Sequence, residues 1–255
     1  MRDTEPTAAV VTLHIEESGR GDPLLLMPGF SEGIGDLGVV RKELAQHYRL
    51  IGVDLPGSGE STPIPRAYTK EFYEEDAQTM AALLDERGIR SARIAGFSDG
   101  GEVALLLAAR RPDLVRAVVA WGAVGVIPGT LGPSLDVLER LIDDPPERLA
   151  GWSEDLVARY GRDNARGTMK SWTTALRQLL LAGGDISLGS ARAIQCPVLL
   201  IAGDRDWFCP FDALKALAER ILSTELIVVK GAGHAVHQER AEWFVPTVTR
   251  WLATH

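Results

Sequence analysis

The sequence predicts an α/β fold in which a mainly parallel, doubly wound sheet carries an inserted helical cap. Short apolar runs alternate with longer segments of helical spacing, which is the pattern of a parallel sheet covered by helices on both faces. The alternation is interrupted once, by roughly 70 residues that contain no strand-like run. The 255 residues are also enough for one large hydrophobic core.

The predicted strands are short and mostly apolar, as expected for strands that are buried on both faces. They are Ala9–Ile15, Leu24–Met27, Leu50–Val53, Ala92–Phe97, Ala117–Trp121, Val198–Ala202 and Leu226–Val229. The helices predicted between and after them are Leu37–His47, Lys70–Arg87, Glu102–Arg110, Asp212–Leu222 and Glu239–Leu252. Such strict alternation favours parallel strands, because a parallel connection needs a crossover helix.

The interruption covers residues 122–193 and is predicted to be a helical cap. Helical patterns cover Ser134–Ile142, Glu147–Tyr160 and Asn164–Leu181, and prolines and glycines separate them. This stretch is too long for a crossover connection and too short for an ordinary independent domain. We therefore assign residues 1–121 and 194–255 to the core, and place the cap over the carboxyl edge of the sheet, where open α/β sheets bind ligands. A lateral helical insertion is the alternative.

Composition excludes several classes of function and suggests a cytoplasmic protein. The net charge of -8 disfavours nucleic acid and anionic membranes as partners, because binding of phosphates depends on clustered Lys and Arg. The two cysteines, Cys196 and Cys209, form neither a disulfide framework nor a metal-binding spacing. The polar N-terminal residues lack the apolar core of a signal peptide. The sequence is compatible with a monomer and does not determine the oligomeric state.

The pentapeptide Gly96-Phe97-Ser98-Asp99-Gly100 predicts a nucleophilic serine. It follows a predicted buried strand and opens a predicted helix, which is the context in which G-x-S-x-G presents a serine hydroxyl. The sharp turn strains the backbone of the serine, and the small flanking residues relieve the crowding. We therefore predict that Ser98 is the nucleophile.

A serine hydroxyl is a weak nucleophile and needs an adjacent base. Among five histidines, His234 follows the last predicted strand in a Gly-rich loop, at the same sheet edge as Ser98. We predict that His234 is the base, and His237 is the second choice.

The acid that orients the base should lie between the serine and the histidine in the chain, after another strand. The loop Gly203-Asp204-Arg205-Asp206 supplies two carboxylates. We favour Asp206, which lies further into the loop, over Asp204, which could instead stabilise the turn or pair with Arg205.

An oxyanion hole requires two N–H groups directed at the developing charge. The N–H of Asp99, directly after the nucleophile, is one candidate. The other is the N–H of Phe30, in the loop Pro28-Gly29-Phe30-Ser31 after a predicted strand. A simple strand-to-loop turn is the alternative interpretation of that loop.

Two further groups of residues are predicted to shape the site. The loop from Asp54 to Ser61 is rich in glycine but lacks the lysine of a phosphate-binding loop, so we expect a structural turn that forms the floor of the site. Aromatic side chains are candidates for the wall of the pocket: Trp207 and Phe208 beside Asp206, and Trp152 and Trp172 in the cap. The two cap tryptophans could instead pack the cap onto the core.

Taken together, these residues resemble the α/β-hydrolase family over essentially the whole chain, and within it the valacyclovir hydrolase (biphenyl-hydrolase-like) group. The narrower resemblance rests on Leu26–Gly29, Ser98–Gly101, Trp121–Ala123, Gln195–Pro197 and the pair His234 and His237. It implies that Ser98, Asp206 and His234 form a triad that cleaves α-amino acid esters, and that Asp99 holds the substrate ammonium. Phe97 departs from the tryptophan that is common in that group, and the cap differs more than the core.

The sequence therefore predicts a serine hydrolase of small carboxylic esters, plausibly α-aminoacyl esters, that needs no cofactor or metal. For Asp99, the alternative to an ammonium site is a residue that complements the helix dipole. Two other functions stay open: a carbon–carbon bond hydrolase of the ring-cleavage type, whose substrates carry a carboxylate, and a small-molecule receptor on a hydrolase fold.

Overall fold

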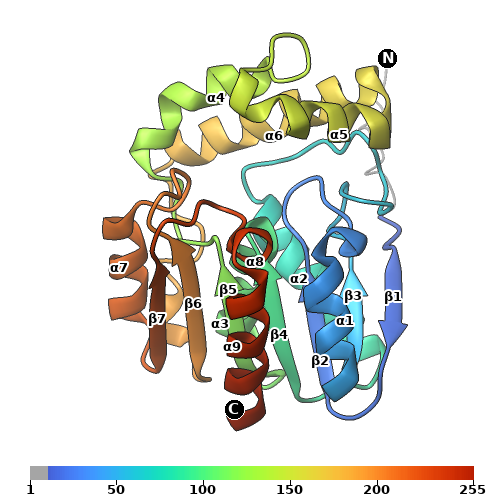
Figure 1. The fold of residues 1–255 in the computed structure, drawn as a ribbon, viewed down its shortest axis with the longest axis vertical. Coiled ribbons are helices and arrows are strands. Elements are labelled where there is room, and N and C mark those ends of the chain that lie inside the picture. The colour runs from blue at the N-terminus through green and yellow to red at the C-terminus, as the bar shows by residue number, and fades with distance from the viewer. Residues whose placement is uncertain (1–10) are drawn as a thin grey trace, which may run out of the picture.

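The computed structural model describes residues 11–255, and its centre is a seven-stranded sheet (Figure 1). The strands are β1 (Ile15–Ser18), β2 (Pro23–Met27), β3 (Arg49–Val53), β4 (Ala92–Phe97), β5 (Val115–Trp121), β6 (Val198–Gly203) and β7 (Thr224–Val229). Their spatial order is β1-β3-β2-β4-β5-β6-β7. Only the edge strand β1 is antiparallel to its neighbour, so the predicted mainly parallel sheet is confirmed.

The first predicted strand, Ala9–Ile15, is placed wrongly. Residues 9 and 10 lie outside the described residues, and the described strand β1 begins only where the prediction ends. Glu16 and Glu17 in β1 pair with arginines on the surface, as suits an edge strand. An edge strand of this polarity does not show as an apolar run, which explains the error.

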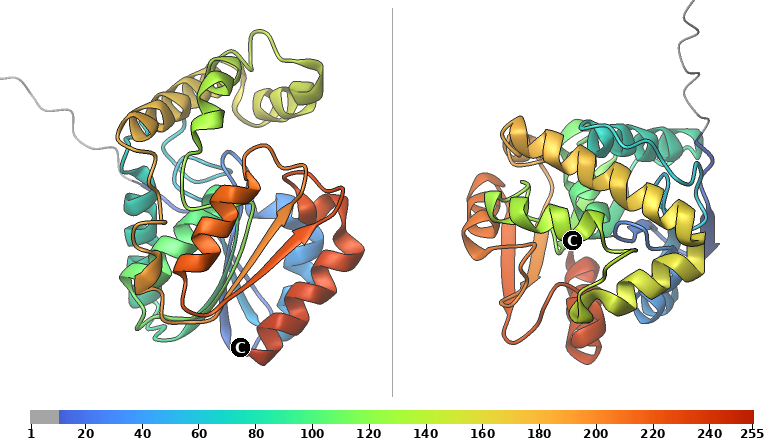
Figure 2. Two further views of the ribbon diagram at one scale, coloured as in Figure 1. Left: turned by 90° about the vertical axis from the view of Figure 1, so that its left-hand side faces the viewer. Right: turned by 90° about the horizontal axis from the view of Figure 1, so that it is seen from above.

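Helices cover both faces of the sheet (Figures 1 and 2). One face carries α2 (Phe72–Glu86), α3 (Asp99–Arg110) and α7 (Phe211–Arg220), and the other carries α1 (Gly38–His47) and α9 (Ala241–Thr254). A short helix, α8 (Val236–Glu239), precedes α9. Because α3 is buried from Asp99 to Ala109, its position at the centre of the molecule is fixed by packing on every side.

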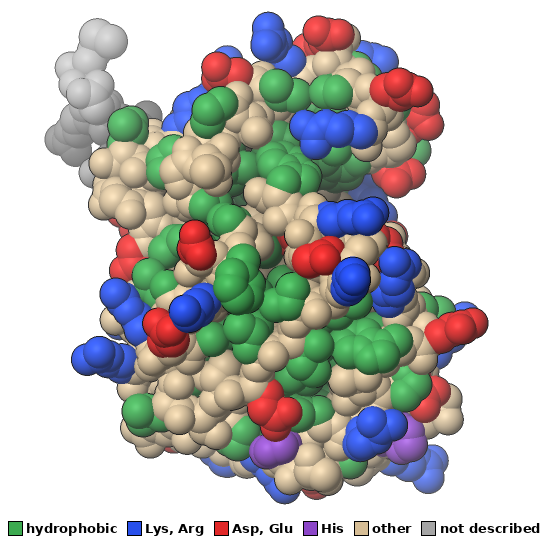
Figure 3. All heavy atoms as spheres, turned by 60° about the vertical axis from the view of Figure 1, so that its left-hand side comes forward, with side chains coloured by type: hydrophobic (Ala, Val, Ile, Leu, Met, Phe, Trp, Pro, Cys, Tyr) green, Lys and Arg blue, Asp and Glu red, His purple; other side chains and the backbone are tan. Residues whose placement is uncertain are grey.

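The segment between β5 and β6 forms a layer of helices over the carboxyl ends of the strands (Figures 1 and 2). It contains α4 (Gly132–Glu139), α5 (Ala150–Tyr160) and α6 (Arg162–Leu181). The same segment contains short 3-10 helices at Gly129–Leu131, Glu147–Leu149 and Ala191–Ala193, and another 3-10 helix, Ile34–Leu37, precedes α1. On the face shown in Figure 3, hydrophobic side chains gather along the junction of this layer with the sheet domain.

A buried glutamate fastens both connections of this layer to the core. Glu102 of α3 accepts hydrogen bonds from the N–H groups of Val124 and Gly125, at 2.8 and 2.7 Å, where the chain leaves β5. It also accepts one from the Ser187 hydroxyl, at 2.8 Å, on the returning segment. The two connections therefore meet at one side chain.

None of the described helices combines the length and apolar character that a membrane span requires.

Candidate active site

Ser98 lies at the tight turn between β4 and α3. Its backbone has φ 52° and ψ -119°, a conformation that a residue with a side chain rarely adopts. The turn requires glycine on both sides, because a Cβ on Gly96 would lie 2.1 Å from the Gly100 carbonyl oxygen and one on Gly100 would lie 2.4 Å from that of Pro28. The sequence thus builds a strained turn that holds the hydroxyl at the carboxyl edge of the sheet.

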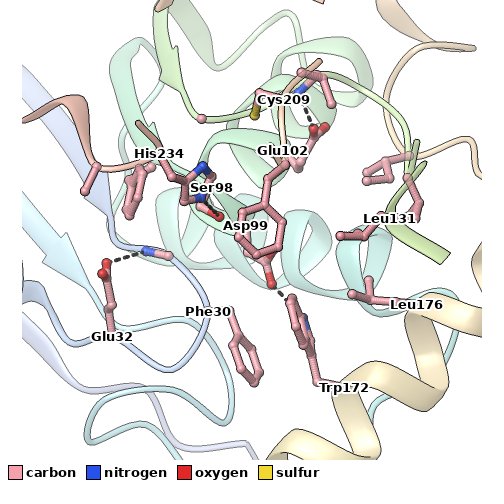
Figure 4. A pocket seen from close by; sticks show the side chains of 18 of the residues that line it. Phe30, Glu32, Ser98, Asp99, Glu102, Leu131, Trp172, Leu176, Cys209 and His234 are labelled. Carbon is pink, nitrogen blue, oxygen red and sulfur yellow. Dashed lines mark hydrogen bonds between the residues drawn. The ribbon is translucent and has the colours of Figure 1, made fainter. Parts of the chain in front are cut away.

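His234, in the loop after β7, contacts both Ser98 and Asp206. Its Nε2 lies 3.0 Å from Ser98 Oγ and its Nδ1 lies 2.7 Å from Asp206 Oδ2. Figure 4 shows Ser98 and His234 pointing toward each other beside Asp99. With the proton on Nδ1, the ring donates to the carboxylate and presents an acceptor to the serine hydroxyl. The structure brings together the three residues that the sequence proposes as a triad.

The two carboxylates of the loop after β6 have different partners. Asp206 is buried, and its Oδ1 also accepts a hydrogen bond from the Phe208 N–H at 2.9 Å. Burial by itself would raise the pKa of Asp206, but the hydrogen bond and charge of His234 outweigh it, so its pKa lies below the ordinary value. Asp204 is exposed and accepts from the Gly231 N–H at 2.6 Å, which stabilises the neighbouring loop.

The second-choice base, His237, is placed away from Ser98. It is buried among aromatic rings, and its Nδ1 accepts a hydrogen bond from the Trp121 indole N–H at 3.0 Å. Burial lowers the pKa of His237 to about 4, so this ring is neutral at physiological pH. Its contacts are those of a packing residue behind the site.

The two N–H groups expected to form an oxyanion hole remain open on the protein side. The neighbours of Phe30 are engaged, since Gly29 N–H donates to Glu32 Oε2 at 3.2 Å and Ser31 N–H donates to Ser58 Oγ at 3.0 Å. Within residues 11–255, the Phe30 N–H donates to no protein group. Asp99 is the first residue of α3, where a backbone N–H has no partner inside the helix.

The loop from Asp54 to Ser61 supports the site from behind and does not form its floor. None of its residues is among those that line the cavity beside Ser98. Instead, Ser58 holds the backbone of Ser31, and the Tyr160 hydroxyl of α5 joins both loops by accepting from Gly59 N–H at 2.7 Å and donating to the Ser31 carbonyl at 2.8 Å. The Gly-rich loop therefore fixes the position of the loop that carries Phe30.

A cavity of about 330 Å³ adjoins Ser98 between the sheet domain and the helical layer above it. Of the predicted pocket residues, Asp99, Trp152, Trp172 and Phe208 line it. The Phe208 ring lies 4.9 Å from the His234 ring, measured between centroids.

Trp207 is the exception, because it is not among the residues that line this cavity. Its ring lies against Phe208 at 3.8 Å between centroids, and the Arg148 guanidinium covers it at 5.1 Å. Phe208 therefore forms part of the cavity wall, and Trp207 packs against the Phe208 ring. The expectation that Trp207 also forms part of this wall is wrong.

Within residues 11–255, four acidic residues and no lysine or arginine line the cavity. Its acidic residues are Glu32, Asp99, Glu102 and Asp155. Asp99 is buried beside Ser98 and accepts hydrogen bonds from the Tyr73 hydroxyl at 2.7 Å and the Trp172 indole N–H at 3.1 Å. Burial raises the pKa of Asp99 to about 6, against the opposing effect of those two donors. At pH 7 the carboxylate is therefore mainly ionised.

Sequence reasoning missed Glu32 and Glu102 as residues of the site. Glu102 is a signal that could have been noticed, because it is a charge in an otherwise apolar helix, one turn after Ser98. Burial raises the pKa of both glutamates, that of Glu102 to about 7. Glu32 accepts a hydrogen bond within its own loop, from the Gly29 N–H, and no pattern in the sequence around it indicates a role in the site.

One cluster among the described residues has donor atoms placed as metal ligands would be, namely Asp206, Cys209 and His234, within 4.8 Å of one another. Both nitrogens of His234 already contact Asp206 and Ser98. A metal ion there would have to replace the contact between His234 and Asp206. The donor set is better explained by a hydrogen-bonded triad.

Comparisons with known proteins show the family and the fold to which the chain is similar. A model described as "Alpha/beta hydrolase family" matches residues 24–247. The human protein "Serine hydrolase BPHL" is 28% identical over 242 residues, which covers 92% of this chain and 80% of that protein. A 2-hydroxymuconate semialdehyde hydrolase from Pseudomonas putida is 31% identical over 265 residues, which covers 98% of this chain and 93% of that enzyme. The fold matches the enol-lactonase from Burkholderia xenovorans LB400 with a TM-score of 0.75 at 22% identity, over 94% of this chain and 96% of that one.

Proposed function

Because this chain belongs to the alpha/beta hydrolase family, we propose that it is a serine hydrolase that cleaves small carboxylic esters, and specifically α-aminoacyl esters. In this proposal Ser98 is the nucleophile, His234 the general base and Asp206 the residue that orients the base. The resemblance to serine hydrolase BPHL and the distances within the triad support it.

The observation that carries the choice of substrate is the charge of the cavity. Asp99 places a buried carboxylate one residue from the nucleophile, and in the part of the chain that the structure describes no lysine or arginine lines the cavity to pair with it. A buried charge without a cationic partner is costly, and a substrate ammonium would offset that cost. The same carboxylate repels anionic substrates, because the interaction between charges is strong in a site that excludes water.

The proposed reaction starts when Ser98 Oγ attacks the ester carbonyl and His234 Nε2 accepts its proton. Asp206 holds the Nδ1–H of the ring and stabilises the imidazolium that forms. The N–H groups of Phe30 and Asp99 donate to the negative oxygen of the tetrahedral intermediate. His234 then protonates the leaving alcohol, which departs and leaves an acyl group on Ser98. Water, deprotonated by His234, attacks that acyl group, and the acid leaves as Ser98 regains its proton.

The rival reaction is carbon–carbon bond hydrolysis of the ring-cleavage type, and two relatives are named for the hydrolysis of 2-hydroxymuconate semialdehyde. A muconate carries a carboxylate, which the acidic lining of this cavity disfavours. The test is a comparison of kcat/KM for a valine ester, the matching 3-methylbutanoate ester and 2-hydroxymuconate semialdehyde.

We expect the valine ester to be the best of these three substrates. Ser98→Ala should lower kcat for any ester by at least about 10³-fold, because the nucleophile is lost. Preferred turnover of the muconate would refute the proposal in favour of the rival. One slow turnover that leaves a stably modified histidine would instead indicate a receptor.

A further inference from the structure

One side chain of the cap, Trp172, contacts both residues whose N–H groups are proposed to form the oxyanion hole. Trp172 of α6 is buried, and its indole N–H donates to Asp99 Oδ2 at 3.1 Å. Its ring also lies against that of Phe30, with centroids 4.0 Å apart and an angle of 15° between the planes. Figure 4 shows Trp172 extending from the cap helix beside Phe30 and toward Asp99.

The Phe30 ring depends on the cap for much of its packing. It is stacked on Trp172, and the edges of Trp152 and Tyr68 lie 6.3 and 5.9 Å from it between centroids. The N–H groups on either side of Phe30 are tied to Glu32 and Ser58. The peptide that carries the Phe30 N–H is also held through its carbonyl, because the Gly29 carbonyl accepts a hydrogen bond from the Glu32 N–H at 3.2 Å. The Trp172 ring adds a contact to the Phe30 side chain, so the position of Phe30 in this loop is linked to that of Trp172.

The Asp99 carboxylate is held from two layers of the fold. Tyr73 donates to it from α2 in the core, and Trp172 donates to it from α6 in the cap. Asp99 also supplies the second N–H of the proposed oxyanion hole. Both residues of that hole are thus in contact with one indole.

We propose that Trp172 is a positioning residue that aligns the oxyanion donor of Phe30 and the cation-binding carboxylate of Asp99 at the same time. This inference rests on the proposed function, in which a substrate ammonium binds at Asp99. Its consequence is that the cap contributes to catalysis even though it carries no residue of the triad. When a substrate binds under the cap, the Asp99 carboxylate and the Phe30 N–H are then both in position for its ammonium group and its carbonyl oxygen.

The two contacts of Trp172 can be separated by substitution. Trp172→Phe keeps a ring against Phe30 but removes the indole N–H, whereas Trp172→Leu removes both contacts. Tyr73→Phe is the matched control for the N–H, because it removes the other donor to Asp99 and leaves Phe30 untouched. Leu138→Ala is the matched control for the cap, because Leu138 is buried in α4 and does not line the cavity.

The first measurement follows Asp99. The ratio of kcat/KM for a trimethylammonioacetate ester to that for its uncharged 3,3-dimethylbutanoate isostere is recorded against pH. Removal of one donor disfavours the charged carboxylate, so the pH at which this preference is half lost should rise by about one unit in Trp172→Phe and in Tyr73→Phe. The charged groups facing Asp99, namely His234, Arg66, Glu102 and Asp76, stay in place in all four variants. An unchanged midpoint in Trp172→Phe would overturn the role toward Asp99.

The second measurement follows Phe30. With the uncharged ester, kcat should be about tenfold lower in Trp172→Leu than in Trp172→Phe, because only the leucine variant frees the oxyanion donor. The rate at which a fluorophosphonate labels Ser98 should fall in parallel, because its phosphoryl oxygen occupies the same hole. Equal rates in the two variants, or an equal loss in Leu138→Ala, would overturn the role toward Phe30.

Two precautions keep the outcomes distinct. If Trp172→Leu does not fold, Phe30→Leu removes the same stacking from the other side and takes its place in the comparison. If the wild-type protein is labelled by the fluorophosphonate but shows no preference for the cationic ester, the ammonium site of the proposed function is refuted and a general serine esterase remains. The labelling rates would then still decide whether Trp172 positions Phe30.

Discussion

Asp99→Asn is the substitution that most directly tests the choice of substrate. It removes one charge and keeps the shape of the side chain. The asparagine can retain both present contacts, since its carbonyl oxygen can accept from the Trp172 N–H and its amide can donate to the Tyr73 oxygen. Loss of activity toward a cationic ester would therefore reflect the charge itself.

The size of the effect follows from the burial of the carboxylate. A charge pair about 4 Å apart at an effective dielectric constant of about 20 is worth about 4 kcal/mol, and removal of one partner of a buried pair costs about 2–5 kcal/mol. Because the pKa of Asp99 is raised only to about 6, most of the charge is present at pH 7. A loss of about 2–4 kcal/mol corresponds to about 30- to 1,000-fold in relative kcat/KM.

The assay measures kcat/KM at pH 7 for a valine ester and for the 3-methylbutanoate ester with the same alcohol. We expect the ratio of the two to fall by that factor in Asp99→Asn, while the value for the uncharged ester changes much less. Glu154→Gln is a matched control, because Glu154 is exposed on α5, does not line the cavity and carries the same charge. A ratio that stays within threefold of the wild type in Asp99→Asn would refute the ammonium site and leave a general carboxylesterase.

Further predictions concern the pH dependence of substrate preference, the role of Asp206 in the triad, and the contribution of Glu102 to stability. The preference for a trimethylammonioacetate ester over its uncharged isostere should disappear as pH falls through about 6, because the Asp99 carboxylate takes up a proton there; a ratio that is flat from pH 5 to 8 would contradict this. Asp206→Asn should lower kcat by about 10⁴-fold without changing the circular dichroism spectrum, since the imidazole loses its orienting acceptor. Glu102→Ala should lower the free energy of unfolding by about 2–4 kcal/mol, because two buried N–H groups lose their acceptor. Glu102→Gln should keep those bonds, and in urea titrations the wild type should lose stability relative to it as pH rises from 4.5 to about 7, because the folded state holds that proton longer.

Much of the fold could be predicted because its signals are local. Buried parallel strands such as β4 and β6 appear as unbroken apolar runs, and their predicted bounds differ from the observed ones by at most one residue. The position of the edge strand β1 was predicted wrongly because the strand contains two adjacent glutamates and no buried side chain, so it has no apolar run. The other edge strand, β7, was predicted from its apolar run Leu226–Val229, so the polarity of β1, and not its edge position alone, explains the error.

The order of Ser98, Asp206 and His234 could also be predicted, because each follows a strand and parallel strands end at one edge of the sheet. The choice between Asp206 and Asp204 needed coordinates, since both belong to the same short loop. So did the difference between Phe208 and Trp207, because the direction of a loop side chain depends on what packs against it. Glu102 could have been suspected from its apolar helix, but its partners at residues 124, 125 and 187 are distant in the sequence.

The sequence by itself determined the α/β architecture, the strained serine turn and the chemical types available at the sheet edge. Those features depend on residue periodicity and on glycines at fixed offsets, which are local properties of the chain. Only the tertiary structure decided which acid contacts His234, which aromatic rings line the cavity, and that Trp172 connects Asp99 with Phe30. These contacts join residues separated by up to about 140 positions, and their geometry arises from packing of the cap on the core, which no local pattern encodes.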